Sequence, residues 1–211
     1  SVIVVVVSGN SDAPPAIGPF APTPASMKRL TLRQYRNSVR DLLGQSVRVP
    51  TDLEVDTPLY GFSTIGAAQL SVSPRAAEQF EAAALDVAHQ VFASSAMRAA
   101  LGGCTPATAG DACVQRFVTT FGRKAWRRPL TTEERARWMS VVSTVTPLFN
   151  DVWAGLEYAV AGMLQSPHFL FRVEMGEPDP DEPARLRYTS LEMASRLSYF
   201  LWGGPPADRL L

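Results

Sequence analysis

The chain has 211 residues, of which 46% are apolar and 19% are charged, so it carries enough apolar material for one domain with its own core. Twenty basic residues balance twenty acidic ones, which excludes a globally basic nucleic-acid-binding protein and a polyacidic chain. The chain has only two cysteines and two histidines, so a four-ligand structural zinc site would need all of them. No stretch approaches the roughly 18 apolar residues that span a bilayer. We therefore expect no nucleic-acid partner and no transmembrane span.

Residues 1–26 are predicted to be an extended arm and linker. Residues 2–7 read Val-Ile-Val-Val-Val-Val, which is too short for a membrane helix and lacks the preceding basic residue of a signal peptide. β-Branched residues favour extended backbone, so this run is either a short strand or remnant, or an arm that docks on a partner through residues such as Val4 and Val5. Five prolines between positions 14 and 24 follow and indicate an extended linker. The folded unit is expected over residues 27–211.

The first half of that unit predicts two helices separated by a loop. Thr31 and Gln34 have the spacing of a capping box, and Gly44 can end the first helix in the left-handed region. Residues 45–72 contain two prolines and two glycines and are predicted to be a loop. A long helix is then expected over residues 73–101, with a serine as cap, a proline in the first turn and two glycines as the stop.

The second half predicts four more helices. Two of them begin with a capping box, formed by Thr131 with Glu134 and by Thr189 with Glu192. Residues 207–211 look like the beginning of another helix, and there is no convincing run of alternating strand residues. The predicted fold is all-α, with about six helices in an irregular orthogonal bundle. The four predicted bounds are 111–128, 131–146, 150–165 and 189–202.

The two cysteines lie between two predicted helices. Eight residues separate Cys104 from Cys113, so a disulfide would tie the end of one helix to the start of the next. The alternative is a pair of free thiols, as a cytosolic chain often has. We predict the disulfide, and with it an oxidising, extracytoplasmic compartment. The chain has no Cys-x-x-Cys-His motif, so it does not itself attach a c-type haem.

One segment concentrates positive charge. Residues 116–137 carry seven basic side chains against two acidic ones, together with a tryptophan. On a helix surface these side chains would either be solvated and form local ion pairs, or contact an acidic partner. The candidate docking residues of this segment are Arg123, Lys124, Trp126, Arg127 and Arg128.

Few residues suggest catalysis or metal binding. His168, among aromatic neighbours, and His89, within a long helix, are both interpreted as structural, with catalysis by His168 as the alternative. The acidic segment 174–182 is interpreted as a solvated linker, with calcium binding as the alternative. No phosphate-binding glycine loop, nucleophile elbow or zinc helix is present in the sequence. We therefore assign no catalytic residue, cofactor or metal ligand, and leave open whether the chain is part of an enzyme.

Three blocks of sequence resemble a known family. The first block is residues 29–44, which begin Arg-Leu-Thr-Leu-Arg-Gln-Tyr, and the second is residues 117–131, which end Phe-Gly-Arg-Lys-Ala-Trp-Arg-Arg-Pro-Leu-Thr. The third is Leu-Gln-Ser-Pro-His-Phe-Leu-Phe-Arg-Val-Glu at 164–174, followed by residues 191–202, which end Arg-Leu-Ser-Tyr-Phe-Leu-Trp. In this order they resemble the N-terminal modules of large secreted proteins grouped with planctomycete-type, cytochrome-c-associated domains of unknown function. The resemblance covers residues 27–211.

This resemblance implies an exported protein in the periplasm or at the cell surface. The family often has a similar cysteine pair before the second block, which supports the disulfide. Family members are normally longer, so the helical domain at 27–211 is expected to be the N-terminal part of a longer protein. No catalytic residues can be transferred from the family. The leading hypothesis is thus that the chain is a non-catalytic helical subunit or docking module of an extracytoplasmic assembly. Its partner would be a c-type cytochrome or a membrane complex, and any haem would be held by that partner. The alternative hypothesis is that the chain is part of a secreted oxidoreductase that works with a c-type cytochrome. A third hypothesis is that it is a secreted hydrolase that uses His168.

Overall fold

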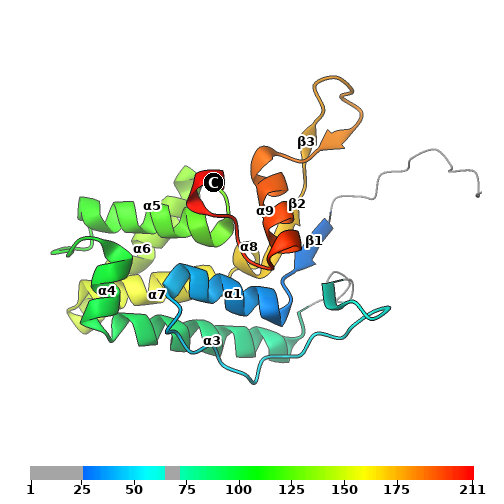
Figure 1. Ribbon diagram of the computed structural model, residues 1–211. Helices are drawn as coiled ribbons and strands as arrows, with labels where there is room; N and C mark the ends of the chain where they lie inside the picture. The colour runs from blue at the N-terminus through cyan, green and yellow to red at the C-terminus, as the bar shows by residue number, and fades with distance from the viewer. Residues whose placement is uncertain (1–25, 65–71) are drawn as a thin grey trace, which may run out of the picture.

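Helix α7 (Val152–Gln165) lies at the centre of the computed structural model, which describes residues 26–64 and 72–211 (Figure 1). Three long helices pack around it: α3 (Pro74–Phe92), α5 (Ala112–Trp126) and α6 (Thr132–Phe149). A helix surrounded in this way must be apolar on most of its faces, and α7 is. Its fully buried side chains include Leu156, Val160, Met163 and Leu164.

Small residues on one face of α7 allow α6 to approach closely. A β-carbon at Gly155 would lie 2.8 Å from the carbonyl oxygen of Val142, and one at Gly162 would collide with the ring of Trp138. Ala159 is buried between the two glycines along the helix. The α6–α7 contact therefore depends on the absence of side chains at these positions.

The remaining helices confirm the predicted all-α fold. They are α1 (Leu32–Leu43), α4 (Ser95–Gly102), the short α8 (Pro167–Leu170), α9 (Ser190–Leu201) and the 3-10 turn η1 (Asp208–Leu210). In Figure 1, α3, α7 and α5 form layers of similar direction, while α4 and α9 cross them at opposite ends. All three predicted capping boxes form, at the starts of α1, α6 and α9.

Two predicted helix boundaries are wrong. The helix expected over residues 73–101 is broken, because Ser94 takes an extended conformation and its side chain accepts a hydrogen bond from the backbone of Met97 to begin α4. Helix α6 continues through Pro147 to Phe149, because a proline in the last turn removes only one backbone hydrogen bond. Asn150 then ends the helix in the left-handed region.

The expectation of no strands is also wrong. Strand β1 (Ser26–Arg29) pairs antiparallel with β2 (Phe171–Glu174), and a small hairpin joins β3 (Glu177–Pro178) to β4 (Leu186–Arg187). The β1–β2 pair joins segments that are about 145 residues apart, so no local turn or alternation could reveal it. It anchors the start of the described chain against the segment that follows α8.

The disulfide between Cys104 and Cys113 is present and ties α4 to α5, as predicted. Helix α4 has no fully buried residue, so it depends on this link more than the central helices do. None of the helices in the described part of the chain is long and apolar enough to cross a membrane. Val4, Val5 and the rest of the predicted arm lie outside the described residues.

Replacing both cysteines with serine is expected to lower the free energy of unfolding by about 2–3 kcal/mol, because the bond closes a short loop in the unfolded chain. Urea titration of the variant and of the oxidised protein measures this difference. Reduction of the unaltered protein should give the same loss. Equal stability of oxidised and reduced protein would contradict a structural disulfide.

Candidate functional site

The structure does not place the five predicted docking residues of the basic segment on one face. Arg123 is exposed on α5, and the Lys124 ammonium lies 2.8 Å from a carboxylate oxygen of Asp208. Trp126 and Arg127 are only 7% and 5% exposed. Arg128 is partly buried. A docking role for the basic segment as a continuous surface is therefore not supported by this geometry.

Arg127 instead connects several segments from inside the protein. It is the left-handed residue that ends α5, with φ 58°, which turns its side chain back toward α8. Within the described residues, no carboxylate lies within ion-pair distance of its guanidinium. The guanidinium donates at 2.7–3.3 Å to five neutral acceptors, which are the carbonyl oxygens of Ala125, His168, Phe169 and Phe171 and the hydroxyl of Tyr199.

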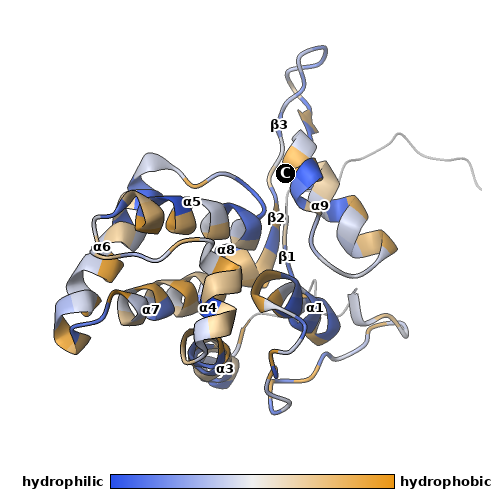
Figure 2. Ribbon diagram, turned by 60° about the vertical axis from the view of Figure 1, so that its left-hand side comes forward, coloured by the Kyte–Doolittle hydropathy of each residue, from blue (hydrophilic) through white to orange (hydrophobic). Residues whose placement is uncertain are grey.

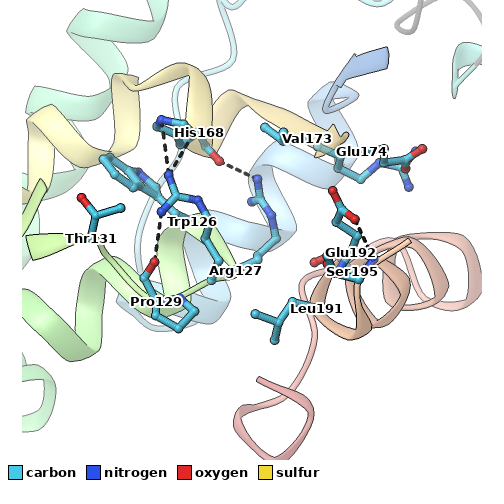
Figure 3. Close-up of a pocket in the computed structure, with 13 residues that line it drawn as sticks. Trp126, Arg127, Pro129, Thr131, His168, Val173, Glu174, Leu191, Glu192 and Ser195 are labelled. Atoms are coloured by element: carbon cyan, nitrogen blue, oxygen red, sulfur yellow. Dashed lines mark hydrogen bonds and ion pairs between the residues drawn. The ribbon is translucent and has the colours of Figure 1, made fainter. Parts of the chain in front are cut away.

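A cavity of about 540 Å³ opens beside Arg127, between the end of α5, α8, β2 and α9 (Figure 3). In the close-up, His168 and Trp126 lie on one side of Arg127, and Glu174, Glu192 and Ser195 lie on the other. The residues that line the cavity are Trp126, Arg127, Arg128, Pro129, Thr131, His168, Arg172, Val173, Glu174, Thr189, Leu191, Glu192 and Ser195.

Arg128 and His168 form a cluster with Trp126 at the rim of this cavity, in which the His168 ring is tilted against the Trp126 ring. The ring centroids of Trp126 and His168 are 4.6 Å apart, and the Arg128 guanidinium lies 5.4 Å from the Trp126 ring. Both Arg128 amino groups bind the Glu134 carboxylate, at 2.7 and 2.8 Å. Arg128 lies 3.4 Å from both nitrogens of His168, a distance at the edge of hydrogen bonding.

Both titratable groups of the cluster have a lowered pKa. Burial, and then the nearby Arg128 charge, hold the pKa of His168 below its usual 6.5, so the imidazole is neutral at pH 7. The hydrogen bonds from Arg128 lower the pKa of Glu134 to about 2. The cluster is thus a fixed ion pair beside a neutral ring.

Acidification is expected to destabilise the protein through this cluster. A group with a lowered folded-state pKa contributes stability that is present above its unfolded pKa and lost as the pH falls. The His168 contribution is lost first, below pH 6.5, and the Glu134 contribution follows from about pH 4.5 toward 2. Urea titrations from pH 7.5 to 4.5 should show the protein losing stability relative to His168→Gln. A relative gain on acidification would contradict a lowered His168 pKa.

The cavity offers little for catalysis. The His168 ring contacts Arg128, Glu134 and Trp126, and no contact joins it to a hydroxyl or thiol among the described residues. Glu192 is occupied as a cap, because its carboxylate accepts backbone hydrogen bonds from Met175, Gly176 and Thr189. In residues 26–64 and 72–211, no three His, Cys, Asp or Glu side chains lie close enough together to hold a metal ion.

A second cavity, of about 770 Å³, lies beside β1, β2 and α9. Three cations that line this cavity contact the buried carboxylate of Glu174: Arg196 at 2.9 Å, Lys28 at 3.4 Å and Arg172 at 3.5 Å. Glu174 itself lines the first cavity. The sequence predicts Glu174 at the start of a solvated acidic linker, but the structure places it on β2, inside the protein. The polar and apolar residues that line the cavity are Lys28, Arg29, Gln34, Thr64, Arg172, Arg196, Leu197, Tyr199 and Phe200.

The exposed face of α9 is the feature that sequence reasoning missed. The residues that α9 buries are Ser195, Ser198 and Tyr199, whereas large apolar side chains face solvent. In Figure 2, α9 stands at the edge of the molecule with apolar residues along it. The capping box predicts this helix from the sequence, but it does not indicate which face of the helix is exposed. We call the exposed set the α9 stripe: Met193, Leu197, Phe200 and Leu201, with Trp202 at the end of the helix.

Comparison with known families covers most of the bundle but not α9. Residues 28–93 match a family model described as PSD3, protein of unknown function (DUF1587). Residues 113–174 match one described as PSD5, protein of unknown function (DUF1595). The chain therefore contains two domains of unknown function. No curated protein and no solved structure matches the chain.

These matches agree with the resemblance noted from the sequence, at the level of domains of unknown function. The first match spans β1, α1 and α3, and the second spans α5 to β2. The two matched regions meet at the β1–β2 pair and in the shared core around α7. The segment from residue 175 onward, which contains the α9 stripe, lies outside both.

Proposed function

We propose that the chain is a non-catalytic helical module that docks on another protein of an extracytoplasmic assembly through the α9 stripe. The observation that carries the proposal is the orientation of α9, with serines toward its own domain and leucine and phenylalanine toward solvent. A helix of a globular domain normally buries its apolar side, so an outward stripe indicates a surface for a partner.

The energetics favour a partner that covers the stripe. Phe200 is 81% exposed, and Met193, Leu197 and Leu201 extend the apolar surface at helical spacing. Each large side chain contributes roughly 1.5–3 kcal/mol when it moves from water to an apolar contact. Several such side chains in one patch are typical of the centre of a protein interface.

The finer parts of the proposal concern compartment and partner. The Cys104–Cys113 disulfide supports an oxidising compartment, the periplasm or the cell surface. The family resemblance supports an electron-transfer assembly in which the partner is a c-type cytochrome or a membrane complex and any haem is held by that partner. The alternative is that the chain is part of a secreted oxidoreductase with such a partner. This alternative is supported only by the same family resemblance.

The experiment compares one apolar substitution on α9 with a matched one elsewhere. Leu148, at the end of α6, is 74% exposed and lies outside the α9 stripe, so Leu148→Ser is a control for Phe200→Ser. A protein that is cross-linked to the unaltered chain in its native host should be lost with Phe200→Ser and kept with Leu148→Ser. Equal cross-linking by both variants would contradict docking through α9.

The same complex tests the cytochrome component. Its visible absorption spectrum, recorded before and after dithionite, should show a haem band that shifts on reduction. A featureless spectrum would remove the electron-transfer partner and the oxidoreductase alternative, and would leave the docking proposal in place.

A further inference from the structure

We propose that the α9 stripe receives an amphipathic helix of a partner protein that carries carboxylates along one edge of its apolar face. This inference rests on the docking function proposed above and adds the chemistry of the partner. It is drawn from the cavity beside α9, which has one apolar wall and one cationic wall.

The apolar wall belongs to the α9 stripe itself. Leu197 and Phe200 both line the 770 Å³ cavity and both continue onto the exposed surface of the helix. The stripe has the i, i+4, i+7 and i+8 spacing by which one helix packs along another. A partner helix that lies along the stripe would pass the mouth of the cavity.

The cationic wall carries more positive charge than its own carboxylate balances. Lys28, Arg172 and Arg196 all contact Glu174, so three cations share one anion and an excess of two positive charges remains. Arg29, the fourth cation of the cavity, is separately paired with Asp56 at 3.2 Å. An incoming carboxylate would therefore meet unbalanced positive charge.

The hydrogen bonds of the cluster support the same conclusion. The Glu174 oxygen that faces Arg172 is buried and accepts no hydrogen bond, and Arg172 makes only this 3.5 Å ionic contact with it. Burial lowers the pKa of Arg172, and the nearby Glu174 carboxylate opposes this shift. Lys28 and Arg196 are partly exposed, so their remaining N–H donors can reach a carboxylate at the cavity mouth.

An anionic membrane also combines apolar and negative surfaces, but the position of the charges favours a protein. In a membrane-binding helix the basic residues flank the apolar face on the helix itself. Here two of the three cations, Lys28 and Arg172, belong to β1 and β2 and are held by a buried carboxylate. A partner with carboxylates at defined positions fits this arrangement better than a plane of lipid headgroups.

The probe is a displayed library of amphipathic 18-residue helices with a constant apolar face and random residues at its edges. Selection on the disulfide-bonded chain should enrich Asp and Glu at one edge, and binding of a selected peptide should weaken as the salt concentration rises. Enrichment of Lys or of uncharged residues would overturn the inference.

Two substitutions with opposite expected effects separate charge from folding. Arg196→Gln should weaken binding of the selected acidic peptide about tenfold, because it removes a cation at the mouth of the cavity. Glu174→Gln should strengthen binding, because it removes the carboxylate that competes for Lys28, Arg172 and Arg196. A merely disruptive change would weaken binding in both variants, and that result would overturn the inference.

The outcomes also distinguish this inference from the docking proposal. Peptides whose binding is lost with Phe200→Ser but does not depend on acidic residues would leave docking intact and remove the acidic chemistry. Selected peptides that do not depend on Phe200 would contradict both. The third arm measures sedimentation of the chain with vesicles of phosphatidylcholine and phosphatidylglycerol. If the chain binds these vesicles and Phe200→Ser abolishes that binding, the α9 stripe is assigned to a membrane instead.

Discussion

Replacing Arg127 with methionine is expected to lower the free energy of unfolding by about 3 kcal/mol or more. The substitution keeps much of the aliphatic volume but removes every donor to the four carbonyl oxygens and the Tyr199 hydroxyl that Arg127 satisfies. A buried acceptor left without a donor costs about 1–3 kcal/mol, and this substitution would leave several buried acceptors without a donor at once. Urea unfolding followed by circular dichroism measures the effect.

The control for this prediction is the neighbouring arginine. Arg128 is partly buried, and its ion pair with Glu134 has access to solvent, so Arg128→Met should cost about 1 kcal/mol or less. Arg127→Lys should recover little of the loss, because one ammonium cannot reach acceptors that a planar guanidinium spans. Equal effects of the two methionine variants would show that Arg127 is not the structural centre that its contacts indicate.

Arg127 also shows where sequence reasoning about the site fails. In the sequence it is one of four basic residues beside Trp126, and nothing distinguishes it from Arg123 or Arg128. Its burial follows from a left-handed backbone at the end of α5, which arginine rarely adopts and composition does not reveal. Three of its five acceptors come from a segment about 40 residues later and a fourth from Tyr199, so only the folded chain brings them together.

The helices were predictable where local signals decide the structure. Thr31, Thr131 and Thr189 each have a Gln or Glu three residues later, and each begins a helix, because both halves of a capping box lie within one turn. The break at Ser94 has only the N-cap half of this chemistry, because the residue three positions later is Met97, and the surrounding helix-favouring alanines hide it. The β1–β2 pair had no such signal, because its two strands are about 145 residues apart in the sequence.

The candidate docking surface was the hardest feature to predict, for a physical reason. An apolar stripe has the same helical spacing whether it faces its own domain or a partner, so periodicity cannot tell which side is covered. In α9 the deciding residues are Ser198 and Tyr199, which turn inward. The Tyr199 hydroxyl contacts Ser38 and Arg127, and this polar network leaves Leu197 and Phe200 outside.

Replacing Phe169 with alanine is expected to cost about 3–5 kcal/mol, the range for deleting a fully buried aromatic side chain. Phe169 lies on α8, and its ring packs edge-on against Tyr35 of α1, with centroids 5.8 Å apart. Its carbonyl oxygen accepts a hydrogen bond from Arg127. It thus connects α1 and α5 through a helix of only four residues, which cannot be stable alone.

The same substitution should also change the pKa of His168, the residue that precedes Phe169. Burial is the main cause of the lowered pKa of His168, so a loosened α8 that admits water should return this pKa toward 6.5. An NMR titration of the histidine ring in Phe169→Ala measures the shift, and Phe149→Ala, at a largely exposed site on α6, is the control that should leave it unchanged. A large loss of stability with an unchanged His168 pKa would mean that Phe169 holds the core but does not shape the cavity beside Arg127.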